Sequence, residues 1–394
     1  MILLSIFAGI VAGVLLAPTL SDLVSLAKIA FGRGAERPAC RPQELPRFLF
    51  LVPAHNEESL IASCVESLRS MRYPAGCVAI WVIADNCSDR TSTLARRAGA
   101  RCLKRHEPRR PGKPQAIAWA LERLPVRDFD AVVIIDADVV VDGAFAAGVA
   151  RAAPLRGKVV QPYNGVRNPS DNALTRMAAV LSAANHQFAF GLKTRAGLNV
   201  PLGAGVSFGS EVLACYGWGA FSIGEDWELY ALMTEQGVRT ESSPQARLYA
   251  EEARSLRQSA SQRHRWAAGK LTVLFRYAGR LLRSRHIGPH QKLDAVAELL
   301  GTGPAVHLGL VTALAAALLM MNAPAAPGLA IALAVSVLRP ATYTLVALAR
   351  EPDPWRKALA FSYLPFYTLW RIGVQLTALT MLGDKPWIRT ERNR

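Results

Sequence analysis

Long apolar segments near both ends of the chain constrain its fold more than any other feature. Residues 1–17 contain no charged side chain, and residues 304–321 and 328–349 form two further apolar stretches. A stretch of about 17 to 25 apolar residues is long enough to cross a bilayer as a helix. The sequence therefore predicts an N-terminal transmembrane anchor over residues 1–30 and C-terminal membrane helices over residues 301–382.

The distribution of basic residues predicts how these segments are oriented. Lys28 and Arg33 follow the first apolar segment, whereas a signal peptide carries its positive charge in front. We expect an anchor whose downstream end is cytoplasmic, with a cleaved signal peptide as the alternative. Residues 358–382 are interrupted by Pro365 and Arg371, which favours a bent third span or a re-entrant pair. Either a re-entrant or an interfacial arrangement leaves a cytoplasmic tail at residues 383–394.

Positive charge is concentrated just before the C-terminal apolar region. The chain of 394 residues has a formal charge of +16, and residues 239–294 hold twelve Lys or Arg against four Asp or Glu. Residues 271–300 combine basic side chains with apolar ones at helical spacing, which predicts amphipathic interface helices, with a packed surface helix as the alternative. Because the charge borders apolar spans instead of alternating with aromatics, we expect a lipid bilayer and no nucleic acid as a partner.

Between the apolar ends lies a soluble α/β pattern, after a Pro-containing linker at residues 31–47. Short apolar runs at residues 48–52, 78–84 and 131–135 are separated by segments of helical periodicity at residues 57–71, 91–98 and 115–124. Continuous Val, Ile and Leu runs that alternate with helices predict parallel strands covered on both faces. In such sheets, ligands bind beyond the carboxyl ends of the strands. The six cysteines show no metal spacing and are expected to be free thiols.

Polar motifs follow the predicted strands in a fixed order, and two more motifs come later. The first three are Pro53-Ala54-His55-Asn56-Glu57-Glu58, Asp85, and Asp136-Ala137-Asp138, and the later two are Gly224-Glu225-Asp226 and Gln262-Arg263-His264-Arg265-Trp266. This ordered set resembles the family-2 glycosyltransferases with a GT-A fold, the membrane-bound group that includes cellulose, chitin and hyaluronan synthases and ceramide glucosyltransferase. The resemblance covers residues 48–270. It implies a Rossmann-like mixed α/β sheet in a cytoplasmic catalytic domain of a multi-pass protein of the cell membrane.

The resemblance implies a site for a nucleotide-sugar donor, which is expected to be a UDP-sugar. Glu57 and Asp85 would contact the base and ribose, because carboxylates accept hydrogen bonds from a uracil N–H and from hydroxyls. Lys113 resembles the Gly-Lys of the family and would approach the diphosphate as a point charge. Arg265 would clamp the leaving diphosphate with its planar fork. The donor-binding set is completed by Pro53, Asp136 and Gln262.

The Asp-x-Asp pair after the third predicted strand suits a divalent cation. Carboxylates at a strand end can hold a hard cation, which in turn holds the donor phosphates. Asp138 is expected to be the direct ligand, with Asp136 contacting the metal or the ribose. A turn or helix-capping pair is the alternative, since Asp142-Gly143 lies nearby. Mg²⁺ and Mn²⁺ use similar oxygen ligands, so either ion is expected.

The remaining motifs are assigned to the acceptor side. Asp226 would be the general base, because inverting transfer needs one carboxylate to take the proton of the attacking hydroxyl. By resemblance, Glu225, Gly205 and Trp266 would contact the acceptor, with Trp266 offering an apolar face to a sugar ring. For Asp226 the alternative is an acidic residue that merely begins a helix at its N-terminus.

We therefore expect an inverting hexosyltransferase that moves a UDP-hexose or UDP-N-acetylhexosamine unit to a growing glycan or lipid-linked acceptor in extracellular polysaccharide synthesis. The alternative is a single-addition glycolipid synthase of the ceramide glucosyltransferase type. A polymer channel needs more helices than this chain offers, so a polymerising enzyme would have to oligomerise or use partner export proteins.

Overall fold

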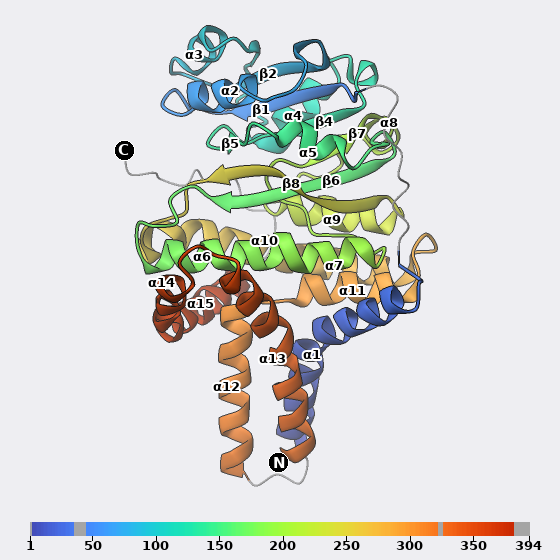
Figure 1. The fold of residues 1–394 in the computed structure, drawn as a ribbon, viewed down its shortest axis with the longest axis vertical. Helices are drawn as coiled ribbons and strands as arrows, with labels where there is room; N and C mark the ends of the chain where they lie inside the picture. The colour runs from blue at the N-terminus through green and yellow to red at the C-terminus, as the bar shows by residue number, and fades with distance from the viewer. Residues whose placement is uncertain (1, 35–44, 322–325, 382–394) are drawn as a thin grey trace. The chain divides into compact units, whose positions relative to one another are not determined.

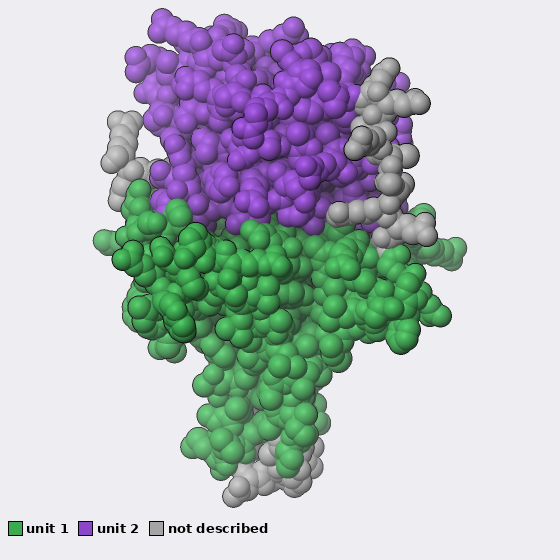
Figure 2. Space-filling model, in the orientation of Figure 1, with its two compact units in different colours: residues 1–35, 169–198, 253–394 green, residues 36–168, 199–252 purple. Residues whose placement is uncertain are grey.

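The computed structural model describes residues 2–34, 45–321 and 326–381, which fall into two compact units (Figure 2). The α/β unit comprises residues 36–168 and 199–252, and the helical unit comprises residues 1–35, 169–198 and 253–394. The expected tail at residues 383–394 and most of the expected linker lie outside the described residues.

Within the described residues, the α/β unit contains an eight-stranded sheet with the order β3-β2-β1-β4-β7-β6-β8-β5 (Figure 1). The strands are β1 (Phe48–Ala54), β2 (Val78–Asp85), β3 (Arg101–Arg105), β4 (Ala131–Ile134), β5 (Val140–Val141), β6 (Lys158–Val166), β7 (Ser207–Gly209) and β8 (Arg239–Ala250). β1 pairs in parallel with β2 and β4, and β2 with β3, whereas β7 is antiparallel to both β4 and β6. The sheet is therefore mixed, as expected.

The three apolar runs of the sequence are confirmed as β1, β2 and β4. Every residue of β1 is buried, because it lies between two strands and is covered on both faces. Its side chains Phe48 and Phe50 belong to a core cluster with residues of the neighbouring strands and helices. The helices of this unit are α2 (Ile61–Arg69), α3 (Thr91–Arg97), α4 (Lys113–Leu121), α5 (Phe145–Ala150), α8 (Ser210–Tyr216) and α9 (Glu225–Glu235), with short 3₁₀ turns at Ala75–Cys77 and Val126–Asp128.

β6 lies next to β7 and pairs in parallel with β8. The apolar runs of the sequence do not indicate this part of the sheet. Thr240, Glu241, Ser242 and Ser243 of β8 are all buried, although polar residues of this kind usually mark exposed segments. Their polar groups are paired: for example, Thr240 Oγ1 donates to the carbonyl of Val200 at 2.9 Å. Buried polar groups are tolerated where they are hydrogen-bonded.

The helical unit consists of helices throughout its described residues. They are α1 (Ile2–Ala30), α6 (Ala173–Ala183), a π-helical turn (Ala184–Ala189), α7 (Phe190–Arg195), α10 (Leu256–Arg283), α11 (Pro289–Leu300), α12 (Pro304–Met321), α13 (Ala326–Ala349), α14 (Pro354–Leu359) and α15 (Leu364–Ala378), with 3₁₀ turns at Ala360–Tyr363 and Leu379–Met381. The domain boundary expected at residue 270 lies inside α10, which is one continuous helix of 28 residues.

Two described helical segments are long and apolar enough to cross a membrane, Ile6–Ala30 and Pro327–Ala349. Pro289–Leu300 and Pro304–Met320 meet the same criterion only together, and they are bent by 84° at their junction. α14 and α15 meet it neither singly nor as a pair. Two candidate spans, or three with the bent pair, therefore follow from length and composition.

A buried ionic network joins four helices of the helical unit. Lys193 of α7 is 1% exposed, and its Nζ lies 2.6 Å from Asp294 Oδ2 and 3.1 Å from Glu298 Oε1, both on α11. Arg339 of α13 contacts Glu298 at 3.3 Å and Asp22 of α1 at 2.8 Å. Burial alone would lower the pKa of Lys193, but Asp294 and Glu298 raise it, so the ammonium stays charged. Opposite charges thus fix these apolar helices against each other.

Candidate active site

Lys113 and Asp136 form an ion pair at the carboxyl end of the central strands. Asp136 lies two residues after the end of β4, and Lys113 is the first residue of α4. Lys113 Nζ lies 2.7 Å from Asp136 Oδ1 and 3.5 Å from Glu225 Oε1. The preceding Gly112 has a φ of 113°, and Pro114 occupies the first turn of α4. A glycine is needed at this φ, and proline suits the start of a helix, so the local sequence fixes where Lys113 emerges.

The acidic surroundings keep Lys113 protonated. Burial by itself would lower its pKa, but the carboxylates of Asp136, Glu225 and Asp226 outweigh burial and raise the pKa above its usual value. Its side chain as a whole is 25% exposed, so the stem is not sealed in the core. The site therefore combines one permanent cation with several carboxylates.

Asp226 shares a small cavity with Lys113. The two side chains line it together with Trp218, Leu229 and residues of the 202–208 segment. Asp226 stands in the first turn of α9, and in the same turn Glu228 Oε2 accepts from the backbone N–H groups of Phe221 and Ser222. These bonds hold the loop that precedes α9. The structure thus brings Lys113 together with Glu225 and Asp226, which lie more than a hundred positions later in the sequence.

Asp138 lies two residues beyond Asp136, where the chain turns toward β5. Burial, followed by the negative charges of Asp138 and Asp136, raises the pKa of the nearby Cys64 thiol, so both carboxylates act on one small region. No group of three or more metal-ligating side chains occurs within the described part of the chain. Two carboxylates suit a cation that takes its other ligands from donor phosphates and water, which is how Mg²⁺ is commonly held. The residues present therefore fit an ion that arrives with its nucleotide.

At the end of β2, Asp85 is buried against a residue that the sequence analysis missed. Arg105 Nη1 lies 2.6 Å from Asp85 Oδ1, and the two side chains are 1% and 6% exposed. The same carboxylate oxygen accepts from Asn86 Nδ2 at 3.0 Å. Asp85 and Arg105 are register partners of β2 and β3, which the sequence alone does not reveal. Arg105 also donates to the carbonyl of Arg110 at 2.6 Å, so it anchors the loop that leads to α4.

The first predicted motif also reaches this edge of the sheet. Pro53 is a buried residue of β1, opposite Ile83 of β2. Glu57 follows in the loop before α2, and its backbone N–H donates to Thr91 Oγ1 at 2.8 Å. The ring Nδ1 of His55 lies 2.8 Å from the carbonyl oxygen of Asp85. The loop after β1 is thus tied to the loop after β2.

Gly205 has a structural reason to be glycine. Its φ is 76°, and a Cβ there would lie 2.1 Å from Leu248 Cδ2 and 3.0 Å from Pro162 Cγ. A side chain there would clash with the sheet itself, so the structure explains this glycine without an acceptor. Its expected contact with the acceptor stays a prediction.

Gln262, Arg265 and Trp266 belong to α10 of the helical unit. Their i, i+3 and i+4 spacing places them on one side of the helix. The Trp266 side chain is 44% exposed, and the guanidinium carbon of Arg263 lies 4.9 Å from its ring centroid. An exposed indole with one face covered by a cation leaves an apolar surface for a ligand.

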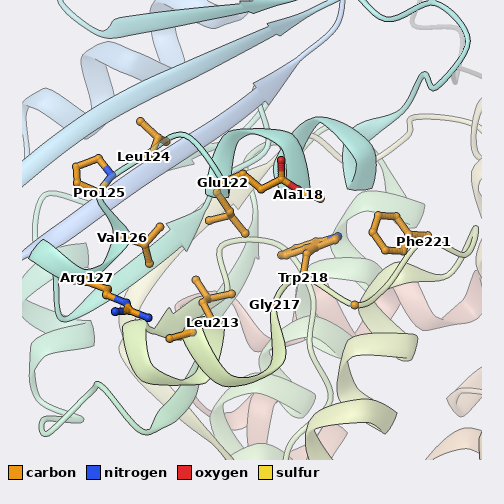
Figure 3. A pocket seen from close by; sticks show the side chains of 13 residues that line it. Ala118, Glu122, Leu124, Pro125, Val126, Arg127, Leu213, Gly217, Trp218 and Phe221 are labelled. Carbon is orange, nitrogen blue, oxygen red and sulfur yellow. The ribbon is translucent and has the colours of Figure 1, made fainter.

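A larger cavity of about 550 Å³ lies elsewhere in the α/β unit (Figure 3). α4 and α8, together with the segments that follow them, supply its mostly apolar lining, which includes Leu124, Val126, Leu213 and Phe221. None of the predicted site residues lines it, and Trp218 alone is shared with the cavity beside Asp226.

Several proteins of known sequence resemble this chain. A β-monoglucosyldiacylglycerol synthase of Trichormus variabilis is 27% identical over 266 residues, which is 61% of this chain and 52% of that protein. The chain thus spans about half the length of the curated relatives it matches. A probable glycosyltransferase of Bacillus subtilis, YdaM, is 40% identical over 52 residues, 13% of this chain and 12% of that protein.

Among solved structures, the mannosyltransferase PcManGT of Pyrobaculum calidifontis, in complex with GDP-Man and Mn²⁺, has a TM-score of 0.55 at 20% identity. The match covers 94% of this chain and 97% of that one. This likeness confirms the GT-A fold. The family described as Glycosyltransferase like family 2 matches residues 46–269, more than half of the chain. The chain therefore belongs to Glycosyltransferase like family 2.

Proposed function

We propose that this protein is an inverting hexosyltransferase that transfers a single sugar from a nucleotide-sugar to a lipid acceptor. The observation that carries the proposal is the convergence of Lys113, Asp136, Glu225 and Asp226 at one edge of the sheet. One charged amine and several carboxylates are what a leaving diphosphate and an attacking hydroxyl require.

Asp226 is the proposed general base. Its carboxylate would accept the proton of the acceptor hydroxyl while that oxygen attacks the anomeric carbon. The position is suitable because Asp226 lines the same cavity as Lys113, which would lie on the side of the departing diphosphate. Glu225, the residue before it in α9, would hold the acceptor through hydrogen bonds.

The donor would bind along the carboxyl ends of β1, β2 and β4. Asp85 would read the base with the oxygen that does not face Arg105, and Glu57 and Pro53 would line the same end. Lys113 would move onto the diphosphate at the N-terminus of α4, where the positive end of the helix dipole also favours an anion. Gln262, Arg265 and Trp266 keep the roles that the family resemblance implies, and Gly205 keeps its place beside the acceptor.

Asp138 and Asp136 would hold a divalent cation, either Mg²⁺ or Mn²⁺. When bound, this ion would offset the negative charge that develops on the leaving diphosphate. The proposal is supported by the two carboxylates after β4 and by the Mn²⁺ in the mannosyltransferase that shares the fold.

The lipid acceptor is inferred from two observations. Two curated relatives are named as β-monoglucosyldiacylglycerol synthases. The candidate spans Ile6–Ala30 and Pro327–Ala349 would also keep the enzyme at a membrane, where such acceptors are found. With both spans inserted, the protein is multi-pass, and the basic segments beside them favour a cytoplasmic transferase domain over residues 48–270.

The proposal is tested with the detergent-purified full chain. The protein is incubated with radiolabelled UDP-glucose, UDP-galactose, UDP-N-acetylglucosamine or GDP-mannose, together with diacylglycerol micelles, and the products are sized and identified by mass spectrometry. One discrete glycolipid from one donor supports the proposal. A ladder of products would show polymerisation and restore polysaccharide synthesis as the function. Release of free sugar alone, from every donor, would contradict both.

A further inference from the structure

Lys113 pairs with Asp136, the carboxylate to which the proposed function also assigns a divalent cation. Lys113 Nζ lies 2.7 Å from Asp136 Oδ1, which is the distance of a charge-assisted hydrogen bond. Its second partner, Glu225 Oε1, is 3.5 Å away. The ammonium therefore neutralises the carboxylate that follows β4 and the one that begins α9.

We propose that Lys113 competes with the divalent cation for the carboxylate of Asp136, so that donor binding exchanges one positive charge for the other. The inference rests on the proposed function, because it takes Asp136 and Asp138 as the place of the cation. It adds that a lysine of the chain itself sets how tightly that cation is held.

The side chain of Lys113 is built for such an exchange. Its backbone is fixed at the first residue of α4, whereas the four-carbon stem is flexible and the side chain is 25% exposed. The side chain of Asp136 is 30% exposed. Neither partner is sealed in the core, unlike Arg105 and Asp85, which are 1% and 6% exposed.

The donor supplies the second partner that the exchange needs. A diphosphate at the N-terminus of α4 would accept hydrogen bonds from the ammonium once it leaves Asp136. Two cations within about 4 Å of each other repel strongly at the edge of a protein. The cation and the ammonium therefore weaken each other's binding to the same carboxylate, and the nucleotide relieves the repulsion by taking the ammonium.

The test measures the binding of Mn²⁺ to the detergent-purified full chain without nucleotide. Electron paramagnetic resonance is the readout. The neutral variants Lys113→Gln and Lys113→Met should bind Mn²⁺ at least about tenfold more tightly than the unaltered protein. Lys113→Arg keeps the charge and should bind like the unaltered protein. Lys104→Gln removes one positive charge from an exposed site on β3 and controls for net charge. In saturating UDP the advantage of the neutral variants should disappear.

Equal or weaker Mn²⁺ binding by both neutral variants overturns the competition. Asp138→Asn then separates this failure from that of the proposed function. If Asp138→Asn removes Mn²⁺ binding while Lys113→Gln brings no gain, the metal site stands and the competition is wrong. Asp138→Asn and Asp136→Asn are also each combined with Lys113→Gln. If these double variants bind Mn²⁺ as tightly as Lys113→Gln alone, the ion binds elsewhere, and both the inference and the metal role of the two aspartates are wrong.

Discussion

The guanidinium of Arg105 and the carboxylate of Asp85 meet at 2.6 Å, at the ends of neighbouring parallel strands and almost fully buried. Each needs the other, because a lone buried charge costs several kcal/mol of desolvation that nothing offsets.

We predict that Arg105→Met lowers the free energy of unfolding by about 3–5 kcal/mol, since it leaves Asp85 buried without its cation. The exposed pair Arg90–Glu58, with side chains 78% and 36% exposed, provides the control. Arg90→Met should change stability by less than about 1 kcal/mol. Denaturant titration followed by circular dichroism measures both, and similar losses in the two variants would contradict the assignment.

Asp226→Asn should reduce turnover by about 10²–10⁴-fold, because the amide cannot take the proton of the acceptor hydroxyl. UDP affinity, measured by calorimetry, should stay close to that of the unaltered protein, since Asp226 is assigned to the acceptor side. Asp128→Asn, an exposed change in the same unit, controls for the substitution itself. Loss of UDP binding in Asp226→Asn would mean that this residue holds the donor.

Gly205→Ala and Gly217→Ala separate backbone strain from steric conflict. Both glycines have a positive φ, 76° and 64°, so each alanine should cost about 1–2 kcal/mol of stability through backbone strain. A Cβ at Gly205 also meets Leu248 Cδ2, whereas nothing lies within 4 Å of one at Gly217. Gly205→Ala should therefore cost about 1–3 kcal/mol more. Thermal unfolding compares the pair, and equal midpoints would show that the sheet yields to the new methyl group.

The lowered pKa of Lys270 in α10 should make the stability of the protein depend on pH. Burial lowers its pKa to about 8, despite the nearby carboxylate of Glu298. Between pH 8 and its ordinary value near pH 10.4 the unfolded chain binds more protons than the folded protein, so this group makes stability rise with pH across that window. The gain should be a few kcal/mol and absent in Lys270→Met. The measurement is the difference in unfolding free energy between the two proteins at pH 7.5 and pH 10.5; a constant difference would show that Lys270 has an ordinary pKa.

The strands that could be predicted are those whose burial follows from composition. Residues 48–52 are continuously apolar, a pattern typical of a short strand covered on both faces. β8 could not be found in this way, because Thr240 and Ser243 look like loop residues until their hydrogen-bond partners are known. The same limit applies to the site. Asp136 and Asp226 were indicated by their motifs, but Arg105 becomes visible only when the register of β2 and β3 sets it opposite Asp85.

The uninterrupted course of α10 has a mechanical consequence. Its 28 residues extend for about 42 Å, and a straight helix turns as one rigid rod. The exposed side chains of Phe275 and Leu282, in the C-terminal part of the helix, offer an apolar surface to a lipid bilayer. If a lipid surface tilts that end of the helix, the indole of Trp266, nine residues before Phe275, tilts with it.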